Sequence, residues 1–180
     1  MDQLPVRARQ YILSVLFLGG IATLAAARSI SLSWEYVPLA VVLLPLMVVF
    51  EFFMIRLPRG VNVSLSTVLR LASIILIGPA YTILLTVSSF VIADGIMRKF
   101  QKTWYKVAFN ASMHAVVSAV SGIAYLAITD ADPRLASSLY DIGAIAMAGL
   151  LYVVINSVMI SVVVALADGL QLGYVWANNQ

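Results

Sequence analysis

Long apolar segments separated by short charged or Gly/Pro-containing breaks dominate this sequence and leave few folds open to it. A bilayer core of about 30 Å is crossed by about 20 mostly apolar residues in a helix. Of the 180 residues, 62% are hydrophobic and 11% are charged, against about 25% charged in soluble domains, so polar side chains are too few to cover a water-exposed surface. We predict one membrane-embedded domain over residues 1–180, an all-α bundle of six transmembrane helices at residues 11–27, 36–55, 63–77, 80–97, 107–128 and 139–167.

The basic residues predict how the chain is threaded through the membrane. With a cytoplasmic N-terminus and six crossings, two of the 11 Lys and Arg residues fall outside, Arg28 and Arg134, and Arg70 lies within a span. The other eight fall on the cytoplasmic side: Arg7, Arg9, Arg56, Arg59, Arg98, Lys99, Lys102 and Lys106. Because cytoplasmic loops carry the excess of Lys and Arg, we expect both termini in the cytoplasm. Alternatively, the first apolar segment is a signal peptide, since it follows two arginines and ends in three alanines.

The third segment differs from the others in length and periodicity. Only about 15 apolar-leaning residues precede Gly78, and residues 61–66 alternate with period two instead of 3.6. This pattern predicts a short helix after extended backbone, which is tolerated at membrane depth only when it is buried in protein or lines a wet cavity. The alternative is a tilted short helix with a frayed start.

Polar residues recur at helical spacing inside three of the spans. On the fifth span they are Asn110, His114, Ser118 and Ser121, which share one face. Similar faces occur on the fourth span, at Thr82, Thr86 and Ser89, and on the sixth, at Asn156, Ser157, Ser161 and Asp168. Such stripes indicate either hydrogen bonds between helices or a ligand or proton site in the bundle.

Charged residues inside the spans need partners, because each costs about 2.5–3.5 kcal/mol on insertion scales. Three lie there: Glu51, Arg70 and Asp94. Counted along their helices, they lie close enough in depth for Arg70 to pair with Asp94 or Glu51. The alternative is that Glu51 and Asp94 sit at the membrane interface beside Arg56 and Arg98.

Several kinds of chemistry have no counterpart in the sequence. It contains no cysteine, which excludes thiolate metal sites, and one histidine, which excludes a metal site built from several histidines. Phosphate-binding loops, paired catalytic carboxylates and a nucleophile elbow are absent. The basic run at residues 98–106 is interleaved with aromatic residues, but between two spans it favours anchoring to anionic headgroups over binding to nucleic acid. We therefore expect no enzyme activity, cofactor or metal in this chain.

Two stretches carry a resemblance to a known family. One runs from Phe50 to Tyr81 and contains LPRG, VSLS and a Gly-Pro turn, and the other runs from Lys102 to Ile128 and contains WYKVAFNA. Together they resemble the multi-pass membrane-associated sensor (MASE-like) domains of bacterial signalling proteins. The resemblance implies a location in the bacterial inner membrane, ahead of an HD-GYP phosphodiesterase, GGDEF diguanylate cyclase or histidine kinase module. Any cyclic-di-GMP or kinase chemistry would reside in that module, and we expect the natural protein to continue past Gln180 into it.

A second resemblance leads to a different function. Substrate-binding S components of energy-coupling-factor vitamin transporters are similar in size and number of spans, with an Ala-x-x-x-Ala in the first helix, as at Ala22 and Ala26, and a Gly-Pro turn followed by an acidic residue, as at Gly78 to Asp94. The string at residues 104–112 favours the sensor. A membrane scaffold without a ligand is the third alternative.

The sequence thus predicts a sensory or regulatory input module that passes a small-molecule, lipid or membrane-state signal to a cytoplasmic output. The expected partners are the lipid bilayer and a cytoplasmic signalling domain, in the same chain or a separate one, and a homodimer is compatible with the sequence. The candidate ligand-binding or coupling residues are Glu51, Ser64, Ser66, Arg70, Asp94, Asn110, His114 and Asn156.

Overall fold

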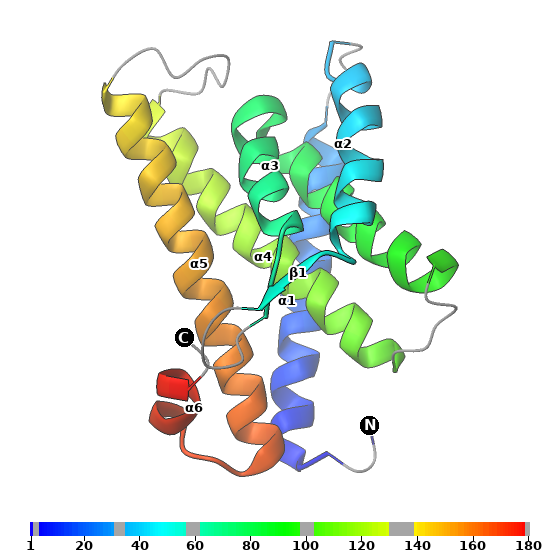
Figure 1. The fold of residues 1–180 in the computed structure, drawn as a ribbon, viewed down its shortest axis with the longest axis vertical. Coiled ribbons are helices and arrows are strands. Elements are labelled where there is room, and N and C mark those ends of the chain that lie inside the picture. Colours follow the sequence, from blue (N-terminus) through cyan, green and yellow to red (C-terminus); the bar gives the residue numbers. More distant parts are fainter. Residues whose placement is uncertain (2–3, 31–34, 57–61, 98–102, 130–138, 179–180) are drawn as a thin grey trace.

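The computed structural model describes residues 1, 4–30, 35–56, 62–97, 103–129 and 139–178, which form helices and one short two-stranded ribbon (Figure 1). A five-residue π-helical turn, η2 (Ala93–Met97), continues α3. The ribbon consists of β1 (Met54–Arg56) and β2 (Asn62–Ser64). The α-helices are α1 (Val6–Ser29), α2 (Val37–Phe50), α3 (Ser66–Ile92), α4 (Trp104–Thr129), α5 (Leu139–Asp168) and α6 (Leu172–Asn178).

Among the described residues, four helices are long and apolar enough to cross a membrane, where the sequence predicted six spans. They cover Val6–Ser29, Ser66–Gly95, Trp104–Thr129 and Ile142–Asp168. The second predicted span is shorter than expected, because α2 ends at Phe50 after 14 residues, which corresponds to about 21 Å. The third and fourth predicted spans are the two arms of the single assigned helix α3.

The two arms of α3 meet at a kink at Gly78. This residue has φ 83° and ψ 165°, a conformation that glycine adopts without strain, and Pro79 has no backbone N–H to continue the helical hydrogen bonds. The hydroxyl of Thr82 donates to the Gly78 carbonyl at 2.9 Å. Just beyond the kink, the ring of Tyr81 lies 5.5 Å from that of Tyr36 at the start of α2. The predicted Gly-Pro break is therefore present as a sharp turn between two helical arms (Figure 1).

The ribbon connects the end of α2 to the start of α3. It is antiparallel, with Ile55 opposite Val63, and Figure 1 shows it at mid-height of the molecule. The extended backbone predicted from the period-two pattern is confirmed at Asn62–Ser64. Its partner β1 was not predicted, and this ribbon is the exception to the expected all-α fold. Pairing the strands satisfies backbone groups that would otherwise lack hydrogen bonds inside the bundle.

The start of α1 and the end of α5 lie at the same end of the molecule (Figure 1). The hydroxyl of Tyr11 donates to the Met159 carbonyl at 3.3 Å, which joins these two helices. This end also carries Arg7 and Arg9, in the first turns of α1, and Lys106, which lines one cavity together with Leu4 and Asp168, and we call it the basic end.

Side chains are distributed as expected for a bundle surrounded by lipid. Large apolar residues are exposed along the helices, including Phe17 at 69%, Ile123 at 66% and Leu150 at 59%. Many polar side chains are buried instead, among them Ser66, Arg70, Thr82, Thr86, Ser118 and Ser121. Helices α1 and α4 pack so closely at Gly19 that an added Cβ would lie 2.3 Å from that of Ser112. The apolar outer surface agrees with a membrane location.

Candidate functional site

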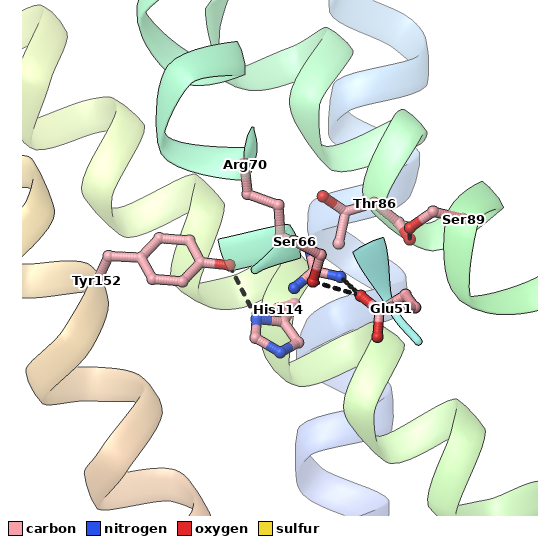
Figure 2. Close-up of polar contacts among 7 residues, drawn as sticks. All are labelled: Glu51, Ser66, Arg70, Thr86, Ser89, His114 and Tyr152. Atoms are coloured by element: carbon pink, nitrogen blue, oxygen red, sulfur yellow. Dashed lines mark hydrogen bonds and ion pairs between the residues drawn. The ribbon is translucent and has the colours of Figure 1, made fainter. Parts of the chain in front are cut away.

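A buried ion pair between Arg70 and Glu51 forms the core of the candidate site (Figure 2). Their side chains are 1% and 8% exposed, and the Arg70 guanidinium donates to Glu51 Oε1. The hydroxyl of Ser66 donates to the same carboxylate oxygen at 2.6 Å. Two donors from α3 thus satisfy one carboxylate placed just after α2.

The local fold explains how these three residues meet. Ser66 and Arg70 are four residues apart on α3 and therefore share a face. The ribbon reverses the chain between Glu51 and Ser66, so the end of α2 lies beside the first turn of α3. The second arm of α3 closes the other side, because the Arg70 guanidinium carbon lies 4.7 Å from the centre of the Phe90 ring. This distance corresponds to a cation–π contact.

A second polar contact continues the site across α4 and α5. His114 Nδ1 lies 2.8 Å from the Tyr152 hydroxyl, and which atom donates depends on the imidazole tautomer. The imidazole is stacked between two rings, with centroid distances of 5.4 Å to Phe90 and 5.9 Å to Tyr152. We call these residues the polar centre: Glu51, Ser66, Arg70, Phe90, His114 and Tyr152.

Several buried polar atoms near the polar centre or farther along α5 have unused hydrogen-bonding capacity. Within the described residues, the buried atoms without a hydrogen-bond partner include Arg70 Nε, Thr86 Oγ1, Ser121 Oγ, Asn156 Oδ1 and Ser161 Oγ. Buried polar groups in native structures are normally paired with protein or ordered water. The bundle interior therefore has donors and acceptors available for water or for a polar ligand.

Four of the eight candidate residues from the sequence meet in the polar centre: Glu51, Ser66, Arg70 and His114. Of the two partners considered for Arg70, the structure has Glu51, and Asp94 is buried separately on η2 with 2% exposure. The predicted pairing of Arg70 with Glu51 is therefore present in the structure, and the alternative placement of Glu51 and Asp94 at the membrane interface stays a prediction. The remaining three lie elsewhere, Asn156 one turn beyond Tyr152, Asn110 in a cavity nearer the basic end, and Ser64 on β2 with its side chain outside the described part.

The sequence analysis missed Tyr152 and Phe90 as members of the site. Tyr152 lies four residues before Asn156, so helical spacing placed it on a polar face already identified. Phe90 follows the polar stripe of the fourth span directly, but an apolar aromatic in a membrane helix carries no signal of its own. Its role depends on the kink, which turns the second arm of α3 back toward Arg70.

A cavity of about 450 Å³ lies between α1, α4 and α5 at the basic end. Its apolar lining consists of Leu4, Ile12, Phe109, Ile160, Val163, Val164 and Ala167, and its polar lining of Tyr105, Lys106, Asn110 and Asp168. We call it the end cavity. Among the described residues, no group of three or more His, Asp or Glu side chains is placed to hold a metal ion.

Comparison with family models, curated proteins and solved structures gives no match for this chain.

Proposed function

We propose that this chain is a membrane-embedded sensory or regulatory input module that passes a small-molecule, lipid or membrane-state signal to a cytoplasmic signalling output. The polar centre is the observation that supports this proposal. It links the end of α2, both arms of α3, α4 and α5 through the Glu51–Arg70 ion pair, the Phe90 ring and one His114–Tyr152 hydrogen bond.

The energetics of this arrangement suit a switch better than a scaffold. Buried ion pairs are weak stabilisers, because desolvation of both charges offsets most of their attraction. A signal shifts a protein only when it binds one arrangement better than another, which requires elements with two arrangements of similar free energy. The candidate moving element is the ribbon with the first arm of α3. It is anchored to the bundle by Arg70, whose contacts reach both α2 and the second arm.

The proposed orientation has the basic end in the cytoplasm and the protein in the bacterial inner membrane. Arg7, Arg9 and Lys106 then lie at the cytoplasmic leaflet, as the positive-inside rule requires. Because α5 ends at the same side, a movement of α5 relative to α4 is delivered to a cytoplasmic domain, whether that domain is in the same chain or a separate one.

The S component of a vitamin transporter is the second candidate, and the end cavity argues against it. Such a subunit captures its solute from outside the cell, so its binding cavity opens to the outer face. In the proposed orientation the end cavity lies at the cytoplasmic side. Co-purification of the chain with an ATPase-coupled partner would restore the transporter as the better explanation.

The test is a chimera in which a diguanylate cyclase domain follows Gln180, with cellular cyclic-di-GMP as the readout. His114→Phe keeps the ring stack but removes the contact to Tyr152, and Arg70→Met removes the ion pair. We expect both to change the output about fivefold or more, the lower end of typical coupling between sites. Ser14→Ala, which removes an exposed hydroxyl on α1, is the matched control and should leave the output unchanged.

Membrane insertion of each chimera is checked by fluorescence-detected size exclusion. If both inserted variants give the same output as the parent chimera, the polar centre does not transmit a signal and the proposed function is wrong.

A further inference from the structure

The end cavity combines an apolar interior with one basic and one acidic side chain at its rim. Lys106 lies in the first turn of α4, Asp168 is the last residue of α5, and both side chains are exposed. Ile12 and Phe109 in the interior are 3% and 5% exposed. The cavity is therefore amphipathic along the direction of the membrane normal, with its charged rim at the basic end.

The charges at the rim have no ion-pair partner among the described residues. An anionic ligand would be attracted by Lys106 but repelled by Asp168, and the reverse holds for a cationic ligand. A headgroup with both a phosphate and an ammonium group matches both residues, and the half-buried Asn110 amide adds a third hydrogen-bonding group one turn deeper.

We infer that the end cavity binds one acyl chain and the headgroup of a phosphatidylethanolamine-type lipid. Lys106 contacts the phosphate, Asp168 contacts the primary ammonium group, and the chain packs between α4 and α5. The volume of about 450 Å³ is within the range of about 300–1,000 Å³ for small-ligand pockets. The cavity thus has room for part of a lipid, while the second chain stays in the bilayer.

The lipid site and the polar centre share the same faces of two helices. On α4, Lys106, Asn110 and His114 follow each other at four-residue spacing. On α5, the cavity residue Ile160 lies two turns beyond Tyr152 on the same face. A lipid in the cavity therefore sets the separation of α4 and α5 at a position nearer the basic end than the His114–Tyr152 hydrogen bond, which is 2.8 Å long.

The inference that the lipid is the signal rests on the proposed function. The inference that the end cavity binds the lipid does not rest on it. Two separate measurements therefore test binding and coupling.

Binding is measured by native mass spectrometry of the purified full chain in detergent, titrated with phosphatidylethanolamine, phosphatidylglycerol or phosphatidylcholine. We expect phosphatidylethanolamine to bind about tenfold more tightly than the other two, the effect of one charge-assisted hydrogen bond in the rim. Water-soluble phosphoethanolamine is titrated as competitor and should not displace the lipid. Equal binding of the three lipids, or displacement by phosphoethanolamine, would overturn the inference.

Four variants locate the site. Asp168→Asn should reduce the preference for phosphatidylethanolamine over phosphatidylglycerol, and Lys106→Gln should weaken the binding of all three lipids. Val164→Phe should fill the cavity and abolish the binding of lipid there. Arg7→Gln, which removes an exposed charge at the basic end but not from the cavity lining, is the control and should bind as the wild type. Retention that is unchanged in Val164→Phe would show that the lipid binds elsewhere.

Coupling is measured by electron–electron distance spectroscopy, which the absence of native cysteine makes straightforward. Spin labels are attached at Thr103→Cys and Gln171→Cys, two exposed positions at the ends of α4 and α5. Added phosphatidylethanolamine should shift the distance distribution in the wild type and not in Val164→Phe. Selective binding without a shift would confirm the lipid site and refute its role as the signal. A responsive chimera without lipid binding would leave the proposed function standing and reject the lipid.

Discussion

Removal of one partner from the Glu51–Arg70 pair should destabilise the bundle more than removal of both. Breaking a buried ion pair leaves an uncompensated charge and costs about 3–5 kcal/mol, whereas replacing both partners by uncharged residues is often neutral. The pair is a strong case, because its side chains are 1% and 8% exposed. The two single substitutions are Glu51→Gln and Arg70→Met, and the third variant combines them.

Both single substitutions should fall within this range. In Glu51→Gln the guanidinium stays charged, because arginine is not deprotonated in proteins. In Arg70→Met the cation–π contact to Phe90, worth about 2 kcal/mol when desolvated, is lost together with the ion pair.

Thermal unfolding in detergent, followed by tryptophan fluorescence, is the assay. At about 2–4 °C per kcal/mol for a chain of this size, each single substitution should lower Tm by about 6–20 °C. The double variant should melt closer to the wild type than either single variant. Arg7→Met, an exposed charge removed at the start of α1, is the control and should change stability by no more than about 0.5 kcal/mol. Losses in the double variant equal to the sum of the singles would refute the reasoning, because they would mean that the two charges do not interact.

Three further outcomes follow from the backbone and from the placement of the helix ends. Gly19→Ala should lower the free energy of unfolding by about 1–3 kcal/mol, because the added methyl group overpacks the contact between α1 and α4. Gly20→Ala has open space around the new methyl group and should be neutral or stabilising by up to about 1 kcal/mol. Thermal melting compares the two variants. Gly78→Ala should cost about 1–3 kcal/mol by the same assay, because φ 83° is strained for any residue with a Cβ, although no atom blocks the site. The variants Arg28→Cys and Gln171→Cys test the threading with a membrane-impermeant maleimide. Arg28→Cys should react in right-side-out vesicles and Gln171→Cys in inverted vesicles, and reaction of both in the same vesicles would contradict the proposed threading.

The membrane character and most helix positions followed from composition and periodicity. Apolar length alone located α1, α4 and α5 to within a few residues, because lipid selects for continuous apolar helix. The kink at Gly78 was also predictable, since glycine and proline act through local backbone chemistry.

The position at which α2 ends and the strand β1 that pairs with β2 were not predictable. After Glu51 the residues 52–55 are apolar enough to continue a span, but α2 ends at Phe50 and the chain enters β1, which pairs with β2. A similar limit applies to Arg70, because helical counting left Glu51 and Asp94 as equal partners. The choice depends on where the ribbon places the end of α2, which is tertiary information.

The short reach of α2 has a consequence for the surrounding lipid. Its 14 residues give a hydrophobic wall of about 21 Å, about 9 Å less than the hydrocarbon thickness of an average bilayer. Such hydrophobic mismatch is relieved by local thinning, at a cost that grows with each ångström. We therefore expect the bilayer beside α2 to be thinned, and to be thinned less in any state that lets this helix extend. On the proposed function, bilayer thickness would then act on the conformational equilibrium directly, without a ligand in any cavity.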